Sequence, residues 1–171
     1  MLELHKLEQN DFELFKSWIK NKDELMQFAG PAILQFPITD EQLERYITDN
    51  RRIVYKIILL ETNEIIGNAE LNFENPRPRL SRILIGDINK RGKGLGKQIV
   101  NKMLEKLFTE YDFQEADLNV YDWNKAGIKC YEKVGFIINP QLSNTQTSCG
   151  TTWIALNMTI TKERWLETRL T

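Results

Sequence analysis

The clearest pattern in the chain is a helical repeat of hydrophobic residues between positions 95 and 111. The apolar positions are Leu95, Ile99, Val100, Met103, Leu104, Leu107, Phe108 and Tyr111. Spacings of three and four residues place them on one face of a helix of about four turns. Residues 83–88 precede it and are apolar on both alternating faces, which is typical of a central strand covered by helices. The pattern predicts a buried strand that leads into a long amphipathic helix.

The first part of the chain alternates short extended and helical patterns. Residues 2–7 predict an edge strand, and a helix with aromatic residues on one face follows it. A second short helix is expected to end near Phe28, before an irregular, partly apolar loop that extends to Pro37. The next helix begins after Thr39, whose spacing from Gln42 fits a capping box.

Two further strands are predicted in the middle of the chain and one after the long helix. Residues 53–60 and 65–73 are separated by a tight turn, which indicates an antiparallel meander. Residues 116–120 alternate as a strand, and residues 125–134 form a helix that Gly135 closes in the usual C-cap position. Strand, helix and strand in this order imply a parallel crossover connection.

The end of the chain completes the predicted fold class, an α/β domain with a mixed sheet. Residues 136–138 are extended, residues 139–152 read as a polar loop, and a last strand covers residues 153–160. The chain shows no internal repeat, linker or low-complexity tract. We therefore expect residues 1–171 to form a single domain.

Composition narrows the classes of function. The 171 residues include 23 Lys and Arg against 24 Asp and Glu, so a net charge of −1 gives no general attraction to nucleic acid or acidic membranes. Cys130, Cys149 and His5 form neither a disulfide framework nor a metal-ligand pattern. No stretch approaches the roughly 20 apolar residues of a membrane span. We expect a cytoplasmic protein without a metal, a nucleic-acid partner or a membrane partner.

A glycine-rich segment marks the start of the long helix. Residues 91–96 read Arg-Gly-Lys-Gly-Leu-Gly, and Lys90 and Lys97 add positive charge on either side. The first turn of a helix leaves backbone N–H groups unpaired and partially positive, and glycines let an anion approach them. The segment therefore predicts a site for a polyphosphate. A tight turn with solvated lysines remains the alternative for these residues alone.

Two common nucleotide signatures do not fit the segment. The nucleoside-triphosphate motif Gly-x-x-x-x-Gly-Lys-Ser/Thr fails because Gly86 lies one residue too far from Gly92, and Gly94 stands where the hydroxyl residue is required. The dinucleotide motif Gly-x-Gly-x-x-Gly fails because the third glycine, Gly96, comes one residue early.

Residues 91–96 resemble the Gln/Arg-x-x-Gly-x-Gly/Ala motif of the GNAT superfamily of acetyl-CoA-dependent N-acetyltransferases. Residues 124–136 resemble its second motif, Asn-x-x-Ala/Gly-x-x-x-Tyr-x-x-x-Gly-Phe. The whole chain, including Trp165 beyond the last strand, is similar to the branch with ribosomal-protein N-terminal and spermidine acetyltransferases. The resemblance implies a mostly antiparallel mixed sheet with one parallel, splayed central strand pair and helices on both faces.

The resemblance also implies a coenzyme A site that relies on the backbone. The N–H groups of residues 92–97 would hold the pyrophosphate, the strand edge at residues 85–88 would pair with pantetheine, and a strand N–H near Ile88 would polarise the acetyl carbonyl. Ile88 stands where many members have proline, which leaves the backbone contact in place. The residues assigned to acetyl-CoA are Ile85, Gly86, Asp87, Ile88, Arg91, Gly92, Lys93, Gly94, Leu95, Gly96, Lys97, Asn124 and Tyr131.

Asn124 and Tyr131 are the side chains to which the resemblance gives chemical roles. They are seven residues apart, which on a helix corresponds to about 10 Å on the same face. Asn124 alone is also explained as a helix N-cap, and Tyr131 alone as a half-buried core residue. A phenol of pKa about 10 stays protonated at neutral pH and can donate to the departing thiolate, whose thiol resembles cysteine at about 8.5. Tyr131 is therefore the predicted general acid.

The remaining chemistry is direct attack by an amine within a ternary complex. Cys130 lies on a helix flank with no histidine base near it in sequence, so we expect it to pack rather than to carry an acyl group. An ammonium of pKa about 10.4 must lose a proton before attack. Glu70 is the predicted base or amine-binding group and Asp87 a second candidate, although a solvated surface carboxylate explains either one.

The acceptor stays open between a peptide N-terminus, a polyamine and another small amine. By family analogy the loops at residues 28–37 and 139–152 border its pocket, and neither contains an acidic cluster. An acetyl-CoA-binding regulatory module without catalysis is the alternative function. The protein is expected to be a monomer or a homodimer.

Overall fold

The computed structural model describes residues 1–148 and 151–170, with only the backbone for residues 146–148 and 151. Cys149 lies outside the described residues. The strands are β1 (Leu2–Lys6), β2 (Arg52–Leu59), β3 (Glu64–Asn72), β4 (Arg79–Ile85), β5 (Glu115–Tyr121), β6 (Ile137–Ser148) and β7 (Thr151–Thr161). The α-helices are α1 (Phe12–Ser17), α2 (Lys22–Ala29), α3 (Asp40–Thr48), α4 (Leu95–Glu105), α5 (Lys125–Val134) and α6 (Lys162–Leu170). The short helical turns are η1 (Gln9–Asp11), η2 (Ile88–Lys90) and the π-helical η3 (Lys106–Glu110) that extends α4.

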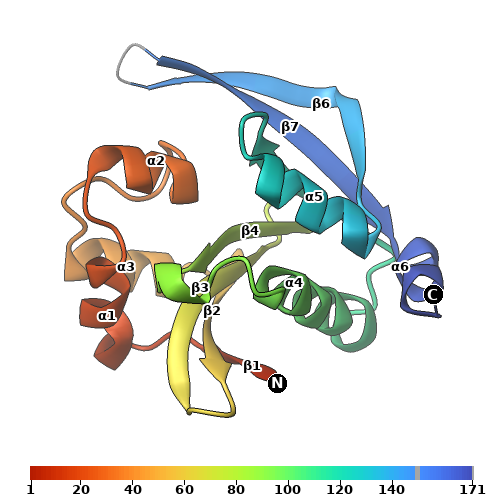
Figure 1. Ribbon diagram of the computed structural model, residues 1–171. Coiled ribbons are helices and arrows are strands. Elements are labelled where there is room, and N and C mark those ends of the chain that lie inside the picture. Colours follow the sequence, from red (N-terminus) through yellow and green to blue (C-terminus); the bar gives the residue numbers. More distant parts are fainter. Residues whose placement is uncertain (149–150, 171) are drawn as a thin grey trace.

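The described strands form one seven-stranded sheet in the order β1-β2-β3-β4-β5-β7-β6 (Figure 1). Strands β1 to β4 pair antiparallel with their neighbours, which confirms the antiparallel pairing predicted for the strands at residues 53–60 and 65–73. Strand β5 pairs with β7 in the same antiparallel manner. Only β4 and β5 run parallel, because α4 crosses between them. The predicted fold class and the predicted parallel crossover are confirmed.

The parallel pair β4 and β5 separates almost as soon as it forms. The two strands are paired at Arg79 with Asp117 and at Leu80 with Leu118, although β4 continues to Ile85 and β5 to Tyr121. Strand β4 also contains a bulge opposite β3, where Arg82 takes a left-handed backbone conformation with φ of 47°. A wedge-shaped gap therefore opens in the middle of the sheet.

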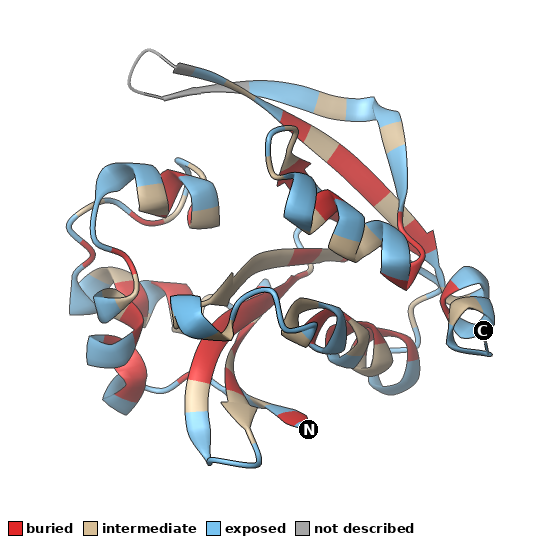
Figure 2. Ribbon diagram, viewed as in Figure 1, coloured by how far each residue is buried: buried red, intermediate tan, exposed pale blue. Residues whose placement is uncertain are grey.

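Helices cover both faces of the sheet and create two hydrophobic cores. One core joins α1, α2 and α3 to the sheet around Phe15, Leu43 and Tyr46. The other packs α4 and α5 against the opposite face, and Trp165 of α6 reaches into it. Figure 2 shows buried residues along the strands and the inward faces of the helices, whereas the outer faces are exposed.

Details of β6, β4 and α3 differ from the sequence-based prediction. Residues 139–148 are part of β6 and not a loop, because they pair with β7 in a hairpin that extends past the body of the sheet (Figure 1). Strand β4 runs over residues 79–85 and does not reach Ile88, which is 71% exposed in η2. At α3, Thr39 caps as expected, but the Gln42 side chain binds the loop at Gln35 and Pro37.

Candidate active site

The N-terminus of α4 presents a row of free backbone donors. Its first backbone bond runs from Gln98 N–H to Gly94 O at 3.4 Å, and the N–H groups of residues 92–97 have no acceptor within the described part of the chain. Gly92 and Gly94 have φ of 76° and 78°, and nothing approaches within 4 Å of the position that a Cβ would take. This geometry is an open anion cradle of the kind that a pyrophosphate fits.

We expect Gly94→Ala to weaken coenzyme A binding, because a Cβ at a positive φ strains the residue by about 1–3 kcal/mol or rotates its peptide groups out of the cradle. Isothermal titration with coenzyme A should show roughly a tenfold rise in Kd, about 1.4 kcal/mol. Lys97→Ala is the control, since it removes an exposed charge without changing the backbone and should cost less. Unchanged affinity in Gly94→Ala would contradict a backbone cradle.

The end of β4 supplies a free strand edge at Ile85, the only one of the predicted residues 85–88 that belongs to the strand. Gly86 N–H donates to Ile66 O at 2.9 Å and Leu84 pairs with Asn68, so these residues bond toward β3. Ile85 lies between them and directs its backbone groups to the other edge, which β5 has left. Arg91 Nε donates to Ile85 O at 2.8 Å, which leaves the Ile85 N–H facing the gap. The predicted N–H near Ile88 is wrong as a strand donor, because Ile88 lies beyond β4.

A donor-side cavity of about 870 Å³ runs from the α4 cradle into the gap. Residues of α1, α2, β4, α4 and α5 line it, among them Trp18, Ile85, Gly86, Arg91 and Gly96. Trp18 lies directly against Gly86, where a Cβ would come within 2.2 Å of the indole ring. Gly86 is therefore required for this close approach. Its predicted contact with coenzyme A stays a prediction.

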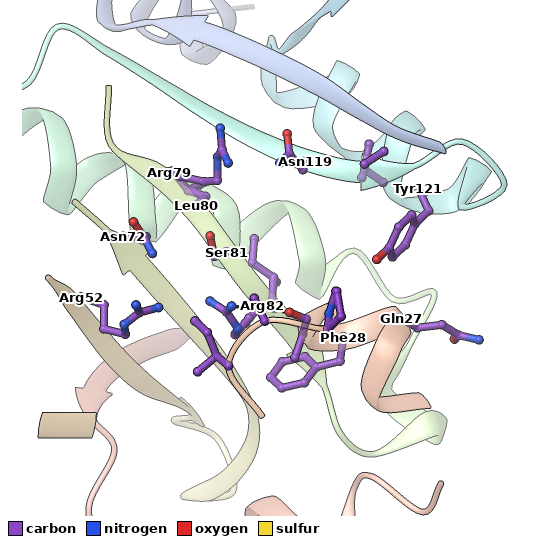
Figure 3. A pocket seen from close by; sticks show the side chains of 18 of the residues that line it. Gln27, Phe28, Arg52, Asn72, Arg79, Leu80, Ser81, Arg82, Asn119 and Tyr121 are labelled. Carbon is purple, nitrogen blue, oxygen red and sulfur yellow. Dashed lines mark hydrogen bonds between the residues drawn. The ribbon is translucent and has the colours of Figure 1, made fainter. Parts of the chain in front are cut away.

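An acceptor-side cavity of about 520 Å³ adjoins the first one. The end of α2 and the loop after it line the cavity from Phe28 to Ile33, together with residues of β2 to β5 (Figure 3). That this segment borders the amine pocket stays a prediction. Within residues 139–145, whose side chains are described, none lines either cavity, and the prediction for the loop at residues 139–152 as a whole stays a prediction. The two cavities share Gln27, Phe28, Ile83, Asn124 and Tyr131. We call these five residues the junction.

Tyr131 stands at the junction with its hydroxyl group free. It packs edge-on against Phe136, with 6.1 Å between the ring centroids, and no described residue hydrogen-bonds its hydroxyl. Burial raises the pKa of the Tyr131 phenol, and the neighbouring Cys130 adds to the rise. The phenol therefore stays protonated at neutral pH and can donate to a group in the gap.

Asn124 is both a helix cap and a cavity residue. Its Oδ1 accepts the Gly127 N–H at 2.9 Å, which fixes the start of α5 and leaves the Nδ2 group for a ligand. Cys130 contacts the opposite helix, since a Cβ at Gly96 would lie 3.2 Å from its Sγ. Burial raises the pKa of the Cys130 thiol, which disfavours the nucleophilic thiolate. This agrees with a packing role for Cys130.

Glu70 is fully buried beneath the acceptor cavity, so the alternative of a solvated carboxylate is wrong. Its oxygens accept from Tyr46 at 2.6 Å, Arg82 at 2.7 Å, Asn72 at 3.1 Å and Arg52 at 3.2 Å. It lines neither cavity. This arrangement positions arginines and leaves the carboxylate without access to an amine. Asp87 does line the donor cavity, where its Oδ1 accepts the Asn89 N–H at 2.9 Å.

The sequence did not single out the arginines of the acceptor cavity. Arg52 of β2 and Arg79 and Arg82 of β4 all line it. Charged residues in strand patterns read as solvent-facing, and only the pairing of β2, β3 and β4 brings them together. The one local sign that Arg79 and Arg82 belong to a buried strand was the apolar run at residues 83–85, which directly follows Arg82.

The sequence pattern of the "Acetyltransferase (GNAT) domain" matches residues 1–137, well over half of the chain. The chain belongs to the GNAT acetyltransferase family. It is therefore an N-acetyltransferase that uses acetyl-CoA as the acetyl donor and an amine as the acceptor. Bound acetyl-CoA supplies a thioester that is activated toward amines, and the α4 cradle and the β4 edge of this GNAT protein fit such a ligand.

Similar proteins come from several bacteria. The chain is 23% identical over 167 residues to the SPbeta prophage-derived uncharacterized N-acetyltransferase YokL of Bacillus subtilis (strain 168), covering 96% of this chain and 92% of that protein. It is 24% identical to the aminoglycoside N(6')-acetyltransferase type 1 of Klebsiella pneumoniae, over 78% of this chain and 72% of that one.

Solved structures show the same fold. The spermidine N-acetyltransferase from Vibrio cholerae in complex with CoA and spermine has a TM-score of 0.80 and 22% identity, with 96% of this chain and 98% of that chain covered. The aminoglycoside acetyltransferase AAC(6')-Ib in complex with coenzyme A has a TM-score of 0.74 and 21% identity, with 99% of each chain covered.

The described residues contain no group of three or more His, Cys, Asp or Glu side chains placed to hold a metal ion. Within the same part of the chain, every helix is too short or too polar to cross a membrane.

Proposed function

We propose that this GNAT protein acetylates a primary amine by direct attack, with the amine in the acceptor cavity and the thioester at the junction. The observation that carries the proposal is the meeting of the two cavities at Tyr131 and Asn124. In the reaction the neutral amine nitrogen forms a bond to the acetyl carbon and the carbon–sulfur bond breaks. The nitrogen gives up one proton as it becomes an amide, and this proton reaches the departing sulfur through water, so coenzyme A leaves as a thiol.

The residues of the gap have separate tasks in this proposal. The N–H groups of residues 92–97 hold the pyrophosphate, and the Ile85 N–H binds the donor at the strand edge. Asn124 Nδ2 orients the donor next to the junction, while Tyr131 donates a hydrogen bond to the sulfur as the carbon–sulfur bond breaks. The remaining assignments of residues 85–97 to the donor rest on their position around this cavity.

The junction contains no carboxylate or imidazole to deprotonate the amine; its five residues are Gln27, Phe28, Ile83, Asn124 and Tyr131. We propose that the ammonium loses its proton to water in the open cavity before attack. The rate then rises with pH toward the pKa of the amine, about 10 for a lysine-like group. Glu70 supports the site by holding arginines in place.

Acceptors of the relatives give the first compounds to test. Their names specify spermidine and aminoglycosides, and a peptide N-terminus is a third class of primary amine. Release of free thiol from acetyl-CoA should depend on the added amine in a panel of small amines, polyamines, aminoglycosides and N-terminal peptides. Coenzyme A binding without thiol release on any amine would support the catalytically inactive regulatory module instead. Reaction at an acyl-enzyme stage, seen as amine-independent acetylation of Cys130, would contradict direct attack.

A further inference from the structure

Most of the charged groups in the wall of the acceptor cavity are guanidinium groups. Arg51, Arg52, Arg79 and Arg82 line it, whereas the only described carboxylate in the lining is Glu74. Figure 3 shows Arg52 and Arg82 side by side at the floor of the cavity, reaching in from β2 and β4. The cavity therefore presents hydrogen-bond donors of positive charge in a protein whose net charge is −1.

Buried carboxylates hold these arginines from behind. Glu70, with no exposed surface, accepts from Arg82 Nη1 at 2.7 Å, and Asp117, which is 3% exposed, accepts from Arg79 Nε and Nη2 at 2.7 and 2.8 Å. Neither carboxylate lines the cavity. A ligand in the cavity thus contacts Arg79 and Arg82 and is separated by them from Asp117 and Glu70, while Glu74 is the one described carboxylate that it can reach. Such fixed arginines are preorganised to bind an oxyanion.

Arg82 also has hydrogen-bonding capacity that the protein leaves unused. Its side chain is 10% exposed, its Nε is buried without an acceptor, and its Nη2 reaches only the Ala29 O at 3.5 Å. A buried guanidinium nitrogen without an acceptor is unfavourable unless a ligand supplies one. The left-handed backbone of Arg82 in the β4 bulge points its side chain to this place.

The position of Arg82 sets the distance between an anion and the reacting amine. It directly precedes Ile83 of the junction, so one extended residue, roughly 3.3 Å of strand, separates the two. Arg79 lies three residues farther along β4 from the same point. A small molecule with its amine at the junction can therefore place a second group against Arg82.

We propose that the acceptor of this enzyme is an amine that also carries an oxyanion, a carboxylate or a phosphate, which Arg82 binds. The inference rests on the proposed function and defines its acceptor class. A polycation is disfavoured, because its second ammonium group meets guanidinium groups of the same charge.

The test uses amines that differ in one end group. The probes are γ-aminobutyrate, its neutral amide γ-aminobutyramide, the diamine putrescine and aminopropyl phosphate. With the unaltered protein, kcat/KM for thiol release should be at least about tenfold higher for the carboxylate or the phosphate than for the amide, and lowest for the diamine. Comparison of kcat/KM for γ-aminobutyrate with that for aminopropyl phosphate shows which of the two oxyanions the site prefers. Equal use of the amide, or preference for the diamine, overturns the inference.

Variants assign the effect to the arginine. Arg82→Gln should reduce the preference for the anionic amine over the amide about tenfold, whereas Arg77→Gln should leave it unchanged. Arg77 pairs with Glu115 at 2.9 Å and lies outside both cavities. Because each variant is judged by the ratio of two substrates, partial unfolding alone does not alter the result. A preference that survives in Arg82→Gln overturns the role of this residue.

A binding measurement separates this inference from the proposed function. Thermal stabilisation by γ-aminobutyrate and by γ-aminobutyramide reports on the anion site without turnover. Stronger stabilisation by the carboxylate with no thiol release keeps the anion site and refutes the acetyl transfer. Thiol release without any preference for the anionic amine keeps the acetyl transfer and refutes the anion site.

Discussion

Tyr131→Phe should lower kcat roughly 100-fold while coenzyme A binds within about twofold of its normal affinity. The variant removes one hydroxyl group from the junction and keeps the ring that packs against Phe136. The departing thiolate then loses the hydrogen bond that stabilises it, a loss confined to the transition state. Steady-state thiol release and titration with coenzyme A measure the two quantities separately.

The raised pKa of Tyr131 specifies how the phenol acts. Complete transfer of its proton to a thiolate whose thiol has a pKa of about 8.5 is uphill, so a donated hydrogen bond is the expected contribution. The phenol keeps this proton at every pH below about 10, and the pH profiles of wild type and variant should therefore have the same shape and differ in height. Tyr111→Phe is the control, since Tyr111 lies outside both cavities. A kcat that is unchanged in Tyr131→Phe refutes the assignment.

Glu70→Gln should destabilise the protein by about 3 kcal/mol, because it leaves Arg52 and Arg82 buried without their shared negative charge. For a chain of this length the melting temperature should fall by roughly 6–12 °C. Denaturant unfolding and thermal scans measure both values. Glu74→Gln is the matched control: its side chain, 36% exposed, pairs with Arg51 and Arg52, so the change should cost at most about 1 kcal/mol.

The same variant decides between a positioning role and a role as base. If Glu70 only holds the arginines, Glu70→Gln keeps the rise of kcat/KM with pH and loses preference for an anionic amine. If Glu70 is the base, the variant loses the dependence of kcat/KM on pH, with the same cost in stability. The second result would support Glu70 as the general base, a role that its buried contacts with Tyr46, Arg52 and Arg82 disfavour.

Elements with a one-sided hydrophobic pattern were predictable from the sequence. The stripe of α4 lies in the core as expected, with Ile99, Met103 and Phe108 fully buried. The polar residues of β6 gave no such signal, because an edge strand in an extended hairpin has little core to face. Helix α6 was missed for a similar reason, since Trp165 is its only buried residue.

Some residues of the candidate site were likewise predictable from the sequence and others were not. Backbone features carry local signatures, so the glycines at positions 92 and 94 and the cap at Asn124 could be recognised from spacing alone. Ion pairs between residues far apart in the sequence leave no such local signature. Arg79 and its partner Asp117 are 38 residues apart and meet only through the short parallel pairing of β4 and β5.

Between β4 and β5 the strands are paired only at Arg79 with Asp117 and at Leu80 with Leu118, so beyond this point the two halves of the sheet are not joined by strand pairing. The half from β1 to β4 carries Arg52 and Arg82, whereas Tyr131 belongs to the half from β5 to β7 with α5. Any change in the angle between the halves would alter the alignment of acceptor and proton donor. A donor bound along Ile85 contacts both halves. When coenzyme A is added, amide hydrogen exchange should therefore slow together at the end of β4 in one half and in α5 of the other half.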